Sequence, residues 1–183
     1  MHTHAMINSI DAMMFWHIVV MNAVAPAIAY VLRARLPATL ERTVFGAAAL
    51  QIILLWGWHS PAALETAMHN PAAGMAMHLT LFLSALWFWS AVVTTSERGI
   101  WRALVALLVT GKLFCLLGAL FAFSRTALYP GHAPLASLET AIADQQLAGL
   151  LMLAVCPLTY VGAALLLSIR WIRGFSSGQE RLA

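Results

Sequence analysis

The stretch IWRALVALLVTGKLFCLLGALFAFS, residues 100–124, carries only two charged side chains among its 25 residues. A transmembrane helix needs about 20 consecutive, mostly apolar residues to cross the hydrocarbon core of a bilayer. This stretch is long enough and apolar enough, and it lacks the alternation of polar and apolar residues that is typical of a half-buried β-strand. It therefore predicts a membrane-spanning α-helix.

The composition of the whole chain indicates more helices of the same kind. Of its 183 residues 62% are hydrophobic and 9% are charged, whereas a soluble domain carries roughly 25% charged residues. Helices satisfy every backbone hydrogen bond inside a bilayer, so we expect an all-α, polytopic transmembrane helical bundle in which residues 1–175 form one domain. Residues 176–183 are expected to form a flexible C-terminal tail. The five expected spans are residues 10–32, 43–58, 74–95, 100–124 and 145–169.

Basic residues predict the orientation of this bundle. Eight of the ten lysines and arginines flank the expected spans on one side, which the positive-inside rule makes cytoplasmic. The N-terminus and the loops at residues 59–73 and 125–144 then face outward, into the periplasm if the membrane is a bacterial inner membrane, and the C-terminus is cytoplasmic. The first span has no basic segment before it and is long for a signal peptide, so we expect it to be retained. Basic residues that mostly flank spans indicate a lipid bilayer as partner and no nucleic acid.

Every histidine maps to the outer face or near it. His17 and His78 fall inside expected spans, where a polar side chain is costly and usually marks a functional site. His59 ends the second span, because Pro61 prevents the helix from continuing. His132 reads mainly as a loop residue, and the histidines of the N-terminal segment as solvated side chains.

Methionines accompany these histidines. Met13, Met14 and Met21 share a helical face with His17, at offsets of three or four residues. A single methionine is more often a core residue than a ligand, so only the grouping favours a site. Imidazole and thioether together suit copper, and methionine selects the cuprous state. If a metal is bound, we expect copper as Cu(I).

Two charged residues have alternative interpretations. Asp144 suits the N-cap of the fifth helix, and it could equally orient a ligand histidine by accepting a ring proton. Lys112 lies in the middle of the fourth span, where an ammonium group costs about 2.5–3.5 kcal/mol on insertion scales. It should face bundle carbonyls and water, or contact a partner subunit.

Three blocks of the chain resemble the CtaG-type cytochrome c oxidase assembly factors, a family of multi-span membrane proteins. They are FWHIVVMNAVAPAIAYVL, then WHSPAALETAMHNPAAGMAMHLTLFLSALWFW, and finally LYP followed by ADQQLAGLLM and an aliphatic helix, and together they extend from about residue 13 to residue 172. The resemblance implies delivery or insertion of copper while a haem–copper oxidase is assembled. Its partners would be oxidase subunits or a periplasmic copper chaperone.

The resemblance also implies site residues. His17, His59, His78 and Asp144 match polar positions that recur in the family's motifs. Met13 stands where the family commonly has a further histidine, and Gly74 and Met77 stand where a histidine and a glutamate are common. The metal ligands expected from residue chemistry and resemblance together are His17, His59, His78, Met13, Met77 and Asp144.

Other functions use the same residues. If the chain is a copper transport or resistance protein, we expect a polar path that continues inward past Cys115, Cys156 and Lys112. A b-type cytochrome would use two of the histidines, such as His17 and His78, as axial haem ligands, and an accessory respiratory subunit would bind no metal. The sequence shows no nucleophile with an adjacent base and no phosphate-binding loop, so we do not expect an enzyme.

Overall fold

The structure is a computed structural model and describes residues 10–129 and 138–180. It confirms an all-α bundle with five helical segments that are long and apolar enough to cross a membrane. Most boundaries lie within a few residues of the expected ones. The candidate spans are Met14–Leu32, Ala38–Trp58, Pro71–Val93, Glu97–Phe123 and Leu138–Gly174.

Several of these spans consist of more than one helical element. The first combines α1, a π-helix and α2, and the second and fourth each begin with a 3₁₀ turn. A short helix, α4, connects the second and third spans. In chain order the elements are α1 Ile10–Val19, η1 Val20–Val24, α2 Ala25–Leu32, η2 Ala38–Thr43, α3 Val44–Trp58, α4 Pro61–His69, α5 Pro71–Val93, η3 Glu97–Gly99, α6 Ile100–Phe123 and α7 Leu138–Glu180.

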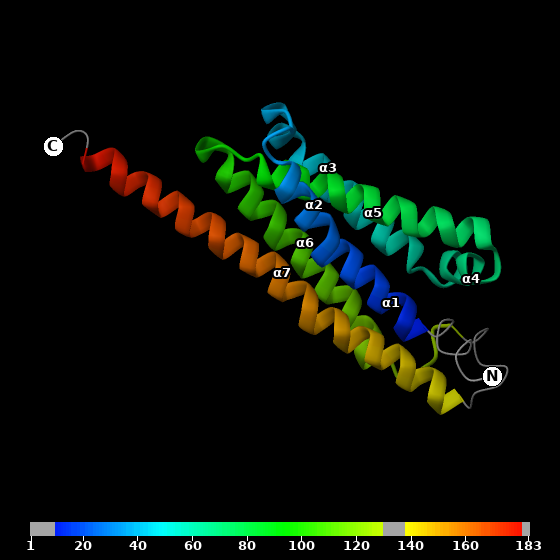
Figure 1. Cartoon of the computed structure of the whole chain (residues 1–183). Coiled ribbons are helices and arrows are strands. Elements are labelled where there is room, and N and C mark those ends of the chain that lie inside the picture. Colours follow the sequence, from blue (N-terminus) through cyan, green and yellow to red (C-terminus); the bar gives the residue numbers. More distant parts are fainter. Residues whose placement is uncertain (1–9, 130–137, 181–183) are drawn as a thin grey trace.

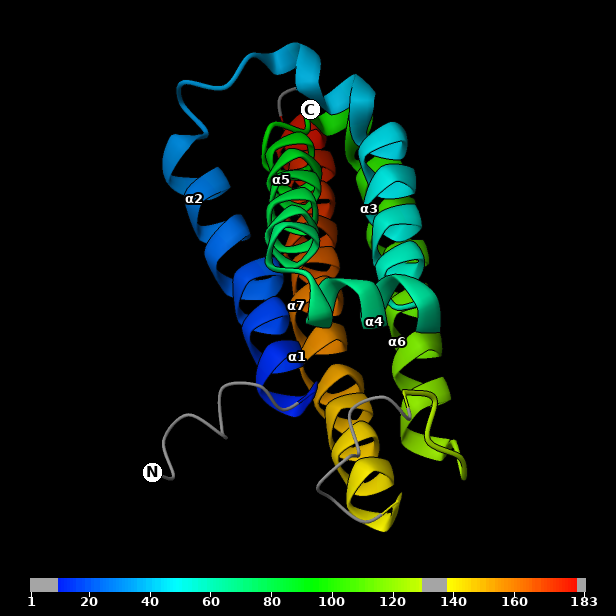
Figure 2. The same ribbon diagram turned by 90° about the vertical axis from the view of Figure 1, so that its right-hand side faces the viewer.

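The spans pack side by side around one apolar core (Figure 1). Figure 2 shows α4 lying across the ends of α3 and α5, and Figure 1 shows it towards the same end of the bundle as the start of α1. This end, which also holds His59 and the first turns of α5 and α7, is called the histidine end below. The opposite end holds Arg33, Arg42, Arg98 and Arg170, and it is called the arginine end.

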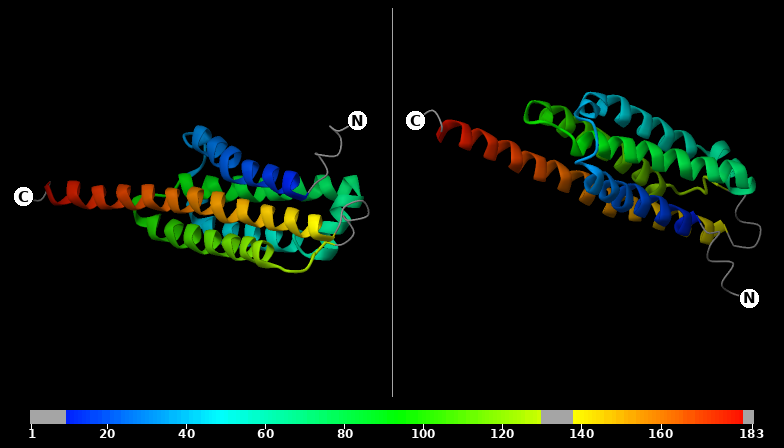
Figure 3. Two further views of the ribbon diagram at one scale, coloured as in Figure 1. Left: turned by 90° about the horizontal axis from the view of Figure 1, so that it is seen from below. Right: turned by 45° about the horizontal axis from the view of Figure 1, so that its top comes forward.

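The helix α7 is longer than the span predicted from the sequence. Its 43 residues correspond to about 64 Å at 1.5 Å per residue, and it projects beyond the rest of the bundle at the arginine end (Figure 3). The described helix already includes residues 138–144, LETAIAD, in which leucine, glutamate and the two alanines are good helix formers. The N-cap prediction for Asp144 is therefore wrong, since this residue lies inside the helix. The helix also includes residues 176–180 of the expected tail, and residues 181–183 are outside the described part.

The third span also starts earlier than expected, at Pro71 instead of residue 74. Asn70 explains this start, because its side-chain oxygen accepts hydrogen bonds from the backbone N–H groups of Ala72 at 2.9 Å and Ala73 at 3.3 Å. An asparagine cap followed by proline in the first turn is a common start for a helix. With this extra turn, α5 begins directly after α4. His78 then lies about two turns after the first residue of α5.

Candidate functional site

Three histidines from three different elements meet at the histidine end. His17 is on α1, His59 directly follows α3, and His78 is on α5. The ring centroid of His17 lies 6.2 Å from that of His59 and 4.6 Å from that of His78. His17 is therefore the central member of the group, in contact with both others.

His59 is held in a single orientation and protonation pattern. Its Nδ1 atom lies 2.7 Å from the carbonyl oxygen of Leu55. A carbonyl can only accept, so Nδ1 carries the proton and Nε2 has a free lone pair. That lone pair faces the sulfur of Met14 at 3.1 Å. Burial lowers the pKa of His59 to about 4, although the bond to Leu55 opposes this shift, so the imidazole is neutral at pH 7.

His17 leaves one ring nitrogen without a partner. Its Nε2 atom lies 2.7 Å from Nδ1 of His78, and one of these two atoms must donate. Its Nδ1 atom is buried and has no hydrogen-bond partner among the described residues. His17 is only 7% exposed, so this bare nitrogen is costly unless a ligand occupies it. His78 is exposed, contrary to the expected burial among the helices, and serves to orient the His17 ring.

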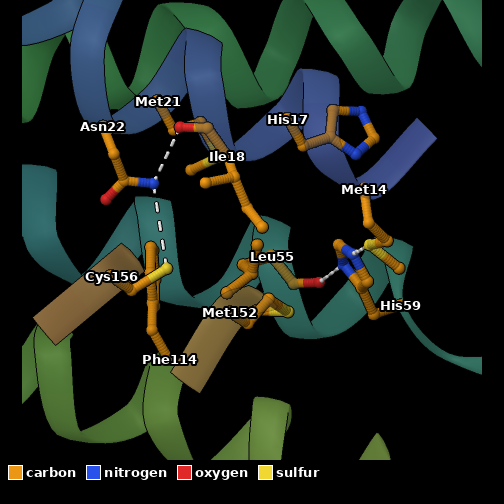
Figure 4. A pocket seen from close by; sticks show the side chains of 10 residues that line it. All are labelled: Met14, His17, Ile18, Met21, Asn22, Leu55, His59, Phe114, Met152 and Cys156. Carbon is orange, nitrogen blue, oxygen red and sulfur yellow. Dashed lines mark hydrogen bonds between the residues drawn. The ribbon is translucent and has the colours of Figure 1, made fainter. Parts of the chain in front are cut away.

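A cavity of about 10 Å³ lies beside His17 and His59 (Figure 4). This volume suits one water molecule or one ion. Four sulfur atoms and two imidazoles are among the groups around it. The lining residues are Met14, His17, Ile18, Met21, Asn22, Leu55, His59, Phe114, Met152 and Cys156.

Helical spacing explains why these donors face one cavity. Met14, His17 and Met21 recur every three or four residues along the first span, and Met152 and Cys156 are one turn apart on α7. The π-helix η1 changes the rotation of the first span at Met21, so that Met21 and its neighbour Asn22 are both buried. Single π-helical turns inside α-helices are frequent at functional sites.

Four of the expected ligands do not line this cavity, and His78, which contacts only the outer side of the group through His17, is one of them. Met77 is buried elsewhere in the core, at 1% exposure. Asp144 is half-buried within α7. The side chain of Met13 lies outside the described part of the chain. Met14 lines the cavity in its stead, and Met21, Met152 and Cys156 join it as donors that were not expected.

The donor set of the cavity fits a soft metal ion. Within residues 10–129 and 138–180, no three His, Cys, Asp or Glu side chains lie close enough together to hold a metal. Any ion in the cavity would therefore depend on methionine sulfur as well as imidazole. Nε2 of His59 fits this role, because a metal-binding histidine typically donates its other N–H to a backbone carbonyl. His17, His59 and Met14 would hold a soft cation, for which thioether and imidazole are suitable ligands.

A second group of hydrogen bonds supports His59 from the loop after α6. The Tyr129 hydroxyl donates to the His59 carbonyl oxygen at 2.7 Å, and burial raises the pKa of Tyr129, which keeps this donor protonated. The side-chain oxygen of Gln145, which is buried on α7, accepts from the N–H of Leu128 at 2.8 Å. Tyr129 and Gln145, both of which fall in the third family-like block, thus connect α7 to the histidine cluster.

Replacing Tyr129 by phenylalanine is expected to lower the free energy of unfolding by about 1 kcal/mol, because it removes one buried hydrogen bond. Thermal unfolding of the purified protein in detergent measures this loss. Tyr30→Phe is the matched control, since Tyr30 is 58% exposed and lies far from the cluster. Equal stability of the two variants would show that the Tyr129 hydroxyl does not support His59.

One comparison with known proteins places the chain in a family. The model of the cytochrome c oxidase caa3 assembly factor family, CtaG, matches residues 3–174. No curated protein and no solved structure matches the chain significantly. Because the match includes all five spans and every residue of the cavity, the chain belongs to the cytochrome c oxidase caa3 assembly factor family.

Proposed function

We propose that this assembly factor binds one cuprous ion in the cavity at its histidine end and supplies it to a haem–copper oxidase during assembly. The observation that carries the proposal is the facing pair of His59 Nε2 and Met14 sulfur at 3.1 Å, beside the unpartnered Nδ1 of His17. His59 Nε2 and the Met14 sulfur are electron-pair donors with no proton between them, and Nδ1 of His17 joins them as a third donor in the tautomer in which its Nε2 donates to His78. Copper(I) is the ion that this combination of donors suits best.

The placement of charge supports an outward-facing site. Seven of the eight arginines in the described residues lie towards the opposite end of the bundle, the exception being Arg125, and by the positive-inside rule this distribution favours a periplasmic histidine end in a bacterium. An ion held there would lie on the same side of the membrane as periplasmic copper carriers and the outward-facing parts of an oxidase. The factor then acts by binding and release, and it needs no catalytic group.

Copper binding can be tested directly on the purified full chain. In the absence of oxygen, with a coloured Cu(I) chelator as competitor, the wild type is expected to bind about one Cu(I) per chain. The double variant His17→Ala/His59→Ala should bind at least about tenfold more weakly, since even residues that only support metal ligands contribute 10- to 100-fold to affinity. His69→Ala is the matched control, because His69 is exposed on α4 at the same end. A double variant that competes as well as wild type would refute this site.

A copper transporter is a second candidate, favoured by polar groups that continue inward from the cavity. Asn22 lines its inner part and donates to the sulfur of Cys156 at 3.8 Å. Deeper in the core, the side chain of Gln51 donates to the Tyr160 hydroxyl at 2.9 Å, and the Thr110 hydroxyl is buried without a partner among the described residues. Copper uptake into sealed vesicles that contain the protein would favour transport, whereas binding without net uptake favours an assembly factor.

A b-type haem is less suited to the same residues. A cavity of about 10 Å³ has room for an ion and not for a porphyrin. The visible absorption spectrum of the purified protein checks this alternative. A haem Soret band would favour the cytochrome, and a colourless protein without bound copper would favour an accessory subunit.

A further inference from the structure

Lys112 is a cation that faces away from the bundle at the middle of a membrane span. It is exposed, twelve residues after the start of α6 and eleven before its end. At 1.5 Å per residue, it lies roughly 17 Å from both ends of the helix, near the centre of a hydrocarbon core about 30 Å thick. Its side chain is too short to bring the ammonium group to either membrane surface.

The surroundings of Lys112 on α6 are apolar. The residues on the same face, three or four positions apart, are exposed aliphatic side chains that would contact lipid tails. No described side chain forms an ion pair or hydrogen bond with Lys112. The exposed neighbours are Val105, Leu108, Val109, Leu116 and Leu120. Because a cation among lipid tails is costly, this face is incomplete without a partner that carries negative charge.

A second copy of this chain cannot supply that charge. The chain has seven Asp and Glu residues, and all of them lie towards one end of the bundle or the other, away from the depth of Lys112. Those towards the histidine end are Asp11, Glu65, Glu139 and Asp144, and those towards the arginine end are Glu41, Glu97 and Glu180. The partner must therefore be a different protein.

We infer that the exposed face of α6 centred on Lys112 binds a membrane-spanning helix of another protein that carries an aspartate or glutamate near its middle. Pairing of the Lys112 ammonium group with that carboxylate shields both charges from the lipid tails. The strength of the association therefore depends on both charged residues and not on either helix alone. The inference concerns how the assembly factor recognises a membrane partner, and it does not depend on copper binding.

Defined peptides test the inference whatever the native partner is. The full chain is reconstituted into phospholipid vesicles with a labelled polyleucine transmembrane peptide that has aspartate, asparagine or leucine at its centre. Energy transfer should report at least about tenfold stronger association with the aspartate peptide than with the leucine peptide, because pairing offsets the cost of two charges in lipid. Lys112→Leu should lose this preference.

A charge reversal separates pairing from a general effect of the substitution. The Lys112→Asp variant should no longer bind the aspartate peptide, and it should instead bind a peptide that has lysine at its centre. Lys112→Leu replaces an exposed side chain within an aliphatic face, so it should stay folded, and unfolding temperatures check this. Equal binding of the aspartate peptide to wild type and Lys112→Leu, or no gain of the lysine peptide by Lys112→Asp, would overturn the inference.

Lys112 is also the only lysine of the chain, which allows the native contact to be mapped. In membranes that contain the full chain, a hydrophobic carbodiimide condenses an amine with a touching carboxylate into an amide and leaves as the corresponding urea. Mass spectrometry should find Lys112 joined to an acidic residue within an apolar stretch of another protein. Cross-links from Lys112 only to carboxylates of soluble domains would contradict the inference.

Discussion

Cells that depend on this chain are expected to lose nearly all of their haem–copper oxidase activity when His17→Ala/His59→Ala replaces the wild type. An oxidase without its copper cannot reduce oxygen, so a defect in copper supply reduces activity far more than it reduces the amount of oxidase protein. Oxygen consumption by isolated membranes measures the loss. Immunoblots of the variant factor and of the oxidase subunits establish that both proteins are still made.

Two further measurements connect this loss to copper. His69→Ala should leave oxidase activity intact, because it removes an exposed histidine at the same end of the bundle. Excess copper in the growth medium should restore part of the activity to the double variant, since a higher ion concentration compensates for weaker binding by mass action. Full oxidase activity in a double variant that fails to bind Cu(I) in vitro would separate the assembly function from copper.

The number and class of the spans could be predicted from the sequence because the bilayer imposes a strong requirement on each one. A helix that crosses lipid needs about 20 apolar residues and few charges, and residues 100–124 satisfy this without reference to any other part of the chain. The ends of spans are less constrained, because polar helices can continue into water. This is why α7 extends well past both predicted limits, residues 145 and 169.

The histidines of the cluster could be predicted, whereas their sulfur partners could not. His17, His59 and His78 each stand out as polar groups near one membrane face. Whether Met13 or Met14 faces His59 depends on the rotation of the first span about its axis, which changes by about 100° from one residue to the next at 3.6 residues per turn. Met152 and Cys156 reach the cavity only because of how α7 is rotated and placed against α1.

The exposure of Lys112 could not be predicted either. Its position at mid-span was evident, and it left open whether the side chain faces the bundle or a partner. Both faces of α6 are apolar, so hydrophobicity does not distinguish them. The buried face is the one with Thr110, Gly111, Phe114 and Gly118, where small side chains allow a close approach of α7.

Replacing Gly149 by leucine is expected to prevent the bundle from forming. Gly149 on α7 packs directly against α6, and a Cβ atom built there would lie 2.6 Å from the carbonyl oxygen of Gly118 and 2.9 Å from Cβ of Phe121, and would also clash with the backbone nitrogen of Ala122. Two of these atoms belong to the backbone and cannot move aside without separating the helices. Small residues that allow backbones to approach are a common basis of helix association in membranes.

Alanine at position 149 should still allow the protein to fold, but with lower stability. Gly149→Ala adds one methyl group and is expected to lower the free energy of unfolding by about 1–3 kcal/mol, the usual range for overpacking. The matched control is Gly162→Ala on the same helix, where an added Cβ meets nothing within 4 Å. That substitution should be neutral or stabilising by about 0.5–1 kcal/mol, because alanine favours a helix over glycine. Unfolding in detergent at increasing denaturant concentration compares the three proteins.

Gly149 also affects the cavity, which gives the prediction a second measurement. Met152 lies one turn further along α7 and lines the cavity, and Gln145 lies one turn before and holds the loop that leads to Tyr129 and His59. A displaced α7 should therefore weaken Cu(I) binding together with stability, whereas His17→Ala/His59→Ala should weaken binding with much less effect on the fold. If Gly149→Ala unfolds at as high a denaturant concentration as Gly162→Ala and binds Cu(I) as tightly, then the packing of α6 against α7 does not depend on this close contact.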